Sequence, residues 1–167
     1  MRPVKVLFPL TATLVLLASG LTAAHAEVVH RDDPTGDAPP RFDVASARYS
    51  HHPARVAVTA QIPDLGDAGW ASLSVSRFRV FEAGYVVLMR KRADEQPRVR
   101  LTYFNHFELE PRRCAGVTGS WDDGEVVLSV PRSCLDGHAR RNVFAQFAIG
   151  RGEHVDRAPA VKRLSSS

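Results

Sequence analysis

Basic side chains recur two residues apart along three consecutive segments that we expect to form β-strands. Residues two apart in a β-strand point to the same face, so each pair would project together. Neighbouring strands would gather the pairs into one cationic surface, formed by Arg77, Arg79, Arg90, Arg92, Arg98 and Arg100, with Lys91 beside them. The planar donor fork of Arg suits carboxylate and phosphate groups. The spacing therefore predicts a face that binds an anionic ligand.

Aromatic residues near these arginines indicate what kind of ligand that face would hold. Tyr85, Tyr103 and Phe104 lie on or beside the same segments and could stack on a sugar ring. The alternative is an ordinary solvated sheet face, on which Glu82, Asp94 and Glu95 balance the arginines.

Aspartates cluster around Thr35-Gly36, near the start of the region that follows the apolar N-terminus. They are Asp32, Asp33, Asp37 and Asp43. Ca²⁺ takes six to eight oxygen ligands from carboxylates and carbonyls on flexible loops, so these residues are a candidate calcium site. The spacing differs from the twelve-residue calcium loop between two helices. The alternative is a turn in which the side chains bond their own backbone.

Histidines and nucleophiles give no catalytic or zinc pattern. His51 and His52 are adjacent, and adjacent strand residues point to opposite faces, so we expect solvated turn histidines. The remaining histidines of the mature chain, His30, His106, His138 and His154, are scattered. The chain has no Gly-x-Ser-x-Gly motif, and no pair of carboxylates is singled out by its spacing as acid and base. We therefore assign no catalytic residue.

The N-terminus predicts export. Arg2 and Lys5 precede an apolar run that ends in Ala24-His25-Ala26, the three-part pattern of a signal peptide cleaved between Ala26 and Glu27. The run is shorter than the span of about 20 residues that a membrane helix needs, so we expect no stable membrane insertion; an uncleaved anchor is the alternative. Removing Arg2 and Lys5 leaves 20 basic against 18 acidic residues, a net charge of +2 that does not favour nucleic acid.

The two cysteines, Cys114 and Cys134, lie in the exported part of the chain. An even cysteine count in an oxidising compartment predicts a disulfide. The two residues bracket a hairpin that turns at Asp123-Gly124, because glycine accepts the positive φ of a tight turn. Two separate buried thiols are the alternative.

Short stretches of alternating apolar residues predict an all-β protein. No long run has apolar residues at helical spacing, and turn signals separate the stretches. We expect a single antiparallel β-sandwich, of jelly-roll or immunoglobulin-like layout. The expected divisions are a signal peptide (1–26), an irregular segment (27–41), the sandwich domain (42–159) and a flexible tail (160–167). The expected strands are 43–50, 55–62, 70–81, 85–91, 98–103, 114–121, 125–130 and 142–149.

Short motifs carry a resemblance to a known group. Asp33-Pro34-Thr35-Gly36-Asp37 precedes a strand that begins at Asp43, and Trp121-Asp122 leads to a strand that ends in Pro131-Arg132-Ser133-Cys134-Leu135. The chain resembles a group of small exported bacterial β-sandwich proteins, whose layout is similar to that of extracellular sugar-binding and haem-binding modules. The resemblance implies the fold and the disulfide, and it implies no particular activity.

Together these features predict a secreted, extracellular, non-enzymatic binding or structural module of the cell envelope. The expected partner is an anionic cell-wall polymer or polysaccharide. One alternative is an extracellular enzyme whose site has no recognised motif. The other is a protein-interaction or inhibitor module that presents a loop such as 64–69.

Overall fold

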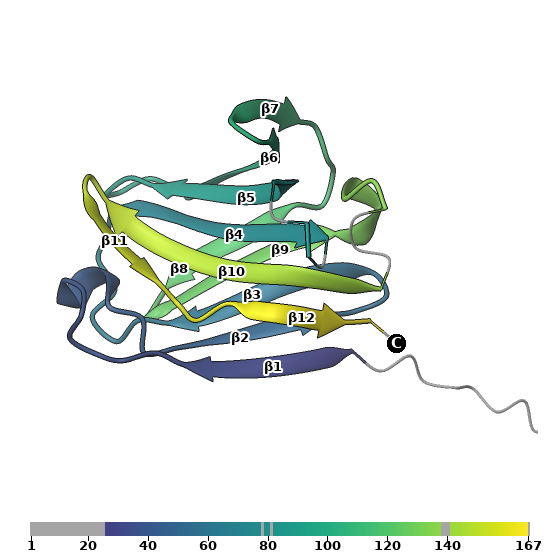
Figure 1. Ribbon diagram of the computed structural model, residues 1–167. Coiled ribbons are helices and arrows are strands. Elements are labelled where there is room, and N and C mark those ends of the chain that lie inside the picture. Colours follow the sequence, from purple (N-terminus) through teal and green to yellow (C-terminus); the bar gives the residue numbers. More distant parts are fainter. Residues whose placement is uncertain (1–25, 78, 81, 138–140, 167) are drawn as a thin grey trace, which may run out of the picture.

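The computed structural model describes residues 26–77, 79–80, 82–137 and 141–166. Two antiparallel sheets pack together (Figure 1), which confirms the predicted all-β fold class. The five-stranded sheet has the order β1 (Glu27–Asp32), β2 (Ser46–His51), β3 (Arg55–Gln61), β9 (Glu125–Pro131) and β8 (Thr118–Asp122). The predicted signal peptide lies outside the described residues, apart from Ala26.

The seven-stranded sheet follows the chain closely over four strands. Its order is β11 (His154–Arg157), β10 (Asn142–Arg151), β4 (Gly69–Arg77), β5 (Ala83–Lys91), β6 (Arg98–Asn105) and β7 (Glu108–Arg112), and β12 (Val161–Ser165) also pairs with β10. Two short 3₁₀ helices, η1 (Pro40–Phe42) and η2 (Arg132–Cys134), lie in the connections. No helix in the described part of the chain has the length and apolar character needed to cross a membrane.

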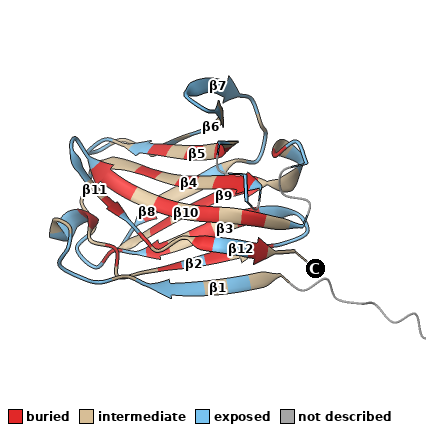
Figure 2. Ribbon diagram, viewed as in Figure 1, coloured by how far each residue is buried: buried red, intermediate tan, exposed pale blue. Residues whose placement is uncertain are grey.

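The core lies between the two sheets and follows the period-two pattern of the sequence. In β3, Val56, Val58 and Ala60 are fully buried, and every second residue of β10 from Val143 to Ile149 is buried in the same way. Figure 2 shows buried residues alternating with less buried ones along the strands. Packing of the two inner faces removes their apolar surface from water. This burial drives the association of the sheets.

The hairpin and disulfide predictions are confirmed. Asp123 and Gly124 both have positive φ, 44° and 78°, at the turn between β8 and β9, as a two-residue hairpin requires. Cys114 and Cys134 form a disulfide, with their Cα atoms 5.9 Å apart. The bond joins the segment before β8 to η2, which follows β9.

Two predicted boundaries are wrong, because edge strands show little alternation. The segment 27–41 is not irregular throughout: β1 forms at Glu27–Asp32, where Val28 is 52% exposed and only Val29 packs against the core. The tail from 160 is not frayed over its described part, because β12 pairs with β10 and buries Val161 and Leu164. Both strands belong to the sandwich, which therefore extends beyond 42–159.

Candidate functional site

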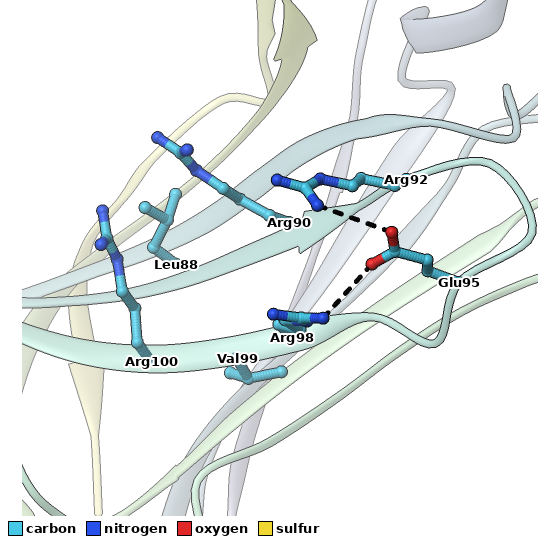
Figure 3. A pocket seen from close by; sticks show the side chains of 7 residues that line it. All are labelled: Leu88, Arg90, Arg92, Glu95, Arg98, Val99 and Arg100. Atoms are coloured by element: carbon cyan, nitrogen blue, oxygen red, sulfur yellow. Dashed lines mark hydrogen bonds and ion pairs between the residues drawn. The ribbon is translucent and has the colours of Figure 1, made fainter.

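Four of the six predicted arginines meet at one end of the seven-stranded sheet. Arg90 and Arg98 are directly opposite each other on β5 and β6, and Arg100 is opposite Leu88. Together with Arg92 and Glu95 they line a pocket of about 250 Å³. The side chains of Arg90 and Arg100 extend in the same direction with Leu88 between them (Figure 3). This part of the prediction identified residues that the fold does bring together.

A second pocket, of about 560 Å³, adjoins the first and shares Arg90 and Arg92 with it. It adds Arg41 from η1, Arg151 from the end of β10, and Trp70 from β4. We call the two pockets together the basic hollow. It is lined by the cations Arg41, Arg90, Lys91, Arg92, Arg98, Arg100 and Arg151, and its acidic residues are Asp67 and Glu95.

The pairing of the strands explains why the hollow forms here. Gly150, Trp70, Arg90 and Arg98 are successive partners across β10, β4, β5 and β6. Partners in an antiparallel sheet share a face and stand about 5 Å apart. The even-numbered residues of β5 face away from the core, because Tyr85, Val87 and Met89 are buried on the other side. One row across the outer face therefore carries an indole and two guanidinium groups.

Few acids neutralise these cations. Glu95 contacts Arg92 and Arg98, with an N–O distance of 3.5 Å in each case. Among the described residues, Arg90 and Arg100 form no salt bridge, and neither do Arg41 and Arg151. Lys91 has a different role, because its ammonium donates to the backbone oxygens of Arg92 and Glu95 and holds the turn after β5. The hollow is therefore a concave cationic surface whose charge is only partly compensated.

Arg77 and Arg79 do not belong to this site, so that part of the prediction is wrong. The segment 70–81 is not one strand: β4 ends at Arg77, and Arg79 has a φ of 66° in the following turn. The outward residues of β4 are Trp70, Ser72, Ser74 and Ser76, so Arg77 has the opposite parity. It also lies seven residues along the strand from Trp70, or about 23 Å.

None of the three predicted aromatic partners lines the hollow. Tyr85 is 1% exposed and lies on the core side of β5, with its ring centroid 5.1 Å from that of Tyr103. Its hydroxyl donates to Asp136, and burial is the main cause that raises its pKa. Phe104 faces outward, but it pairs with Gly84 at the far end of β5. The aromatic residue of the hollow is Trp70. The sequence predicted that Trp70 lies on a strand but did not indicate that it belongs to the site.

The structure brings together only some of the predicted calcium ligands. The structure brings Asp37 and Asp43 together with Asp156 of β11: one ligand atom from each lies within 4.8 Å of the others. Asp33 lies near this group and is electrostatically coupled to all three, but it is not among the side chains whose ligand atoms come within 4.8 Å of one another. Asp32 does not belong to the group, because its side chain is 89% exposed and pairs with His30 at 3.0 Å. No local spacing indicates Asp156, which lies more than a hundred residues along the chain, on the other sheet.

The histidines form no metal site in the ranges that the structure describes. His52 is exposed, as expected, but the prediction of a solvated His51 is wrong: it is fully buried in β2, and its Nδ1 lies 3.2 Å from the carbonyl oxygen of Leu164. The cause is β12, which the sequence did not reveal and which covers this histidine. His30, His106 and His154 are exposed on separate elements, and His138 lies outside the described residues.

Comparison with known proteins adds no assignment to this geometry. The chain has no significant match among models of protein families, curated proteins or solved structures.

Proposed function

We propose that the protein is a secreted, non-enzymatic module of the cell envelope that binds an anionic polymer or polysaccharide in the basic hollow. The observation that carries the proposal is the charge of the hollow: seven cations face two acids, Asp67 and Glu95. The expected mature chain has a net charge of only +2. The hollow therefore concentrates positive charge well beyond the average of the protein.

The repulsion between neighbouring arginines in the hollow supports a role in binding a ligand. Arg90 and Arg98 are directly opposite on neighbouring strands, and like charges in that position destabilise a sheet. An anion between them would remove the repulsion and gain charge-assisted hydrogen bonds. A hollow lined by one sign of charge also raises the local concentration of oppositely charged ligands.

Trp70 supports a sugar component in the polymer. It lies in the same row as Arg90 and lines the larger pocket. An indole offers a broad apolar surface for the C–H face of a sugar, while the arginines bind carboxylate or phosphate groups. The hollow is open along the sheet end, which suits a chain better than a small enclosed molecule.

The proposal is tested by retention of the mature protein on immobilised polygalacturonate and on immobilised teichoic acid over a salt series. We expect retention at low salt that falls steeply as sodium chloride rises, because exposed charges are screened. The double variant R90S/R100S should elute at markedly lower salt. The matched control R55S/R77S removes the same charge from exposed strand positions outside the hollow and should elute close to the unmodified protein, allowing for the overall change in charge.

Equal elution of the two double variants would contradict the proposal, because net charge alone would then explain retention. Trp70→Ala provides a separate measure of the sugar component. It should weaken retention on the polysaccharide more than on a polymer without sugar rings, such as polyglutamate.

A second candidate is a protein-interaction module, which the β6–β7 hairpin favours. Phe107 at its turn is 100% exposed and Leu109 is 69% exposed, and β7 lies at the periphery of the sandwich (Figure 1). The predicted loop 64–69 is a weaker candidate, because Gly66 donates to Arg41 and accepts from the Trp121 indole. Loss of envelope binding in F107S/L109S, with R90S/R100S unaffected, would favour this second function.

A further inference from the structure

Three aspartates meet where the two sheets adjoin at one end of the sandwich, and a fourth, Asp33, lies near them. Asp33 and Asp37 lie in the loop after β1, Asp43 follows η1, and Asp156 lies on β11 of the other sheet. We call these four residues the aspartate cluster. Segments from both sheets thus contribute carboxylates to one small volume.

The hydrogen bonds of the cluster leave some carboxylate oxygens without a partner. Gly36 donates its backbone N–H to Asp43 Oδ2 at 2.7 Å, and Val44 donates to Asp156 Oδ2 at 2.7 Å. Asp33 Oδ2 and Asp43 Oδ1 are both buried from solvent, and neither has a hydrogen-bond partner among the described residues. Buried polar atoms are nearly always paired in proteins, so two unpaired carboxylate oxygens in one cluster indicate a partner outside the polypeptide.

The charges of the cluster point to a cation as that partner. Asp37, Asp43 and Asp156 bring carboxylate oxygens within 4.8 Å of one another. Asp156 is only 6% exposed, and none of the salt bridges among the described residues involves an aspartate of the cluster. Negative charge that is partly withdrawn from water and has no basic partner favours a bound positive charge.

The donor atoms identify the type of cation. All four side chains offer oxygen and none offers nitrogen or sulfur, which suits a hard ion and disfavours zinc. Two oxygens on opposite sides of Ca²⁺ stand about 5 Å apart at its usual bond lengths. The separation within 4.8 Å among Asp37, Asp43 and Asp156 is compatible with that span. A loop also tolerates the irregular geometry of calcium better than the strict octahedron of magnesium.

We propose that the aspartate cluster binds one Ca²⁺ ion, which joins the loop after β1 to β11 and so links the two sheets. The ion neutralises the carboxylates and gives the unpaired oxygens of Asp33 and Asp43 a partner. This site is separate from the basic hollow, and its test does not depend on whether the proposed anion binding is correct.

The test measures Ca²⁺ binding to the mature protein, first stripped with a chelator, by calorimetric titration and by thermal melting. Calcium should raise the melting temperature in a concentration-dependent way, since it binds only the folded state. Magnesium at the same concentration should have a smaller effect. An unchanged melting temperature in millimolar calcium and in chelator overturns the proposal, and an equal response to magnesium overturns the assignment of calcium.

Isosteric variants locate the site. D37N and D43N should each weaken calcium binding by roughly tenfold or more, because affinity follows the number of charged ligands. Both should melt in chelator at the same or a higher temperature than the unmodified protein, since each removes repulsion. D32N is the matched control, an exposed aspartate beside the cluster, and should bind calcium normally. Calcium binding that persists unchanged in both D37N and D43N would overturn the proposal.

Discussion

The basic hollow and the aspartate cluster lie at the same end of the sandwich and gather like charges, yet they differ in exposure. Arg90, Arg98 and Arg100 are exposed, so water and salt screen their repulsion. In the aspartate cluster, Asp156 is buried and two carboxylate oxygens lack a partner. A sheet surface therefore tolerates unpaired charge, whereas the junction between the sheets needs a partner for each charge.

The largest expected difference between the two regions comes from removing one charged group from each. Asp156→Ala removes the acceptor for the buried N–H of Val44 and should lower the free energy of unfolding by about 1–3 kcal/mol. Arg100→Ala removes an exposed charge and should change it by less than about 0.5 kcal/mol. Urea unfolding in chelator measures both. Equal losses in the two variants would show that the two regions do not differ in how strongly their charged groups affect stability.

A pH titration extends the comparison to a neutral buried group beside the aspartate cluster. The Tyr49 hydroxyl accepts from the backbone N–H of Phe147 at 3.0 Å, and burial raises the pKa of Tyr49 to about 12. The folded state therefore resists ionisation that the unfolded chain undergoes near pH 10. The free energy of unfolding should be unaffected by Tyr49 below pH 10 and should fall by about 2 kcal/mol as pH rises to 12.

Two measurements check this pH effect. Tyrosine absorbance near 295 nm should lose, in Tyr49→Phe, a hydroxyl that ionises about two pH units above a free tyrosine in the unmodified protein. Urea unfolding at pH 9 and pH 11 should show a smaller loss for Tyr49→Phe than for the unmodified protein. A parallel loss in both proteins would assign the alkaline effect to other groups.

The smallest expected effect has the opposite sign. Arg90→Thr removes the repulsion between Arg90 and Arg98 and places a good strand former on β5. The variant should be more stable by about 0.2–1 kcal/mol at low ionic strength. The gain should shrink in high salt, where the repulsion is already screened. A variant less stable than the parent at low salt would show that Arg90 contributes packing that outweighs its charge.

The fold could be predicted from the sequence wherever one face of a strand is buried. β3 and β10 alternate cleanly because their inner residues form the core, and the Asp123-Gly124 turn defines the β8–β9 hairpin. β1 and β12 were missed, because edge strands need little apolar surface and take much of their stability from backbone pairing. The end of β4 was misplaced, since Val80 continued the apolar pattern beyond the last paired residue.

The sites could be predicted only as far as local spacing reaches. Arg98 and Arg100 share a strand face by parity alone, and Asp33 and Asp37 share a loop. Arg41, Trp70 and Arg151 join the hollow through the register of separate strands, which one sequence does not specify. Asp156 joins the aspartate cluster through the position of β11 in the second sheet, for the same reason.

The two ends of the described chain pair with each other at the end of the sandwich opposite the basic hollow. Ala26 pairs with Ser166, and the N–H of Ser165 donates to the Glu27 carboxylate, so both ends of the described chain leave the sandwich side by side. Ser165 pairs with Asn142, the first residue of β10, whereas Trp70 pairs with Gly150 near its other end. Eight residues of strand separate these positions by about 26 Å. A tag or surface linker attached at either terminus would therefore hold the protein with its basic hollow directed outward, away from the point of attachment.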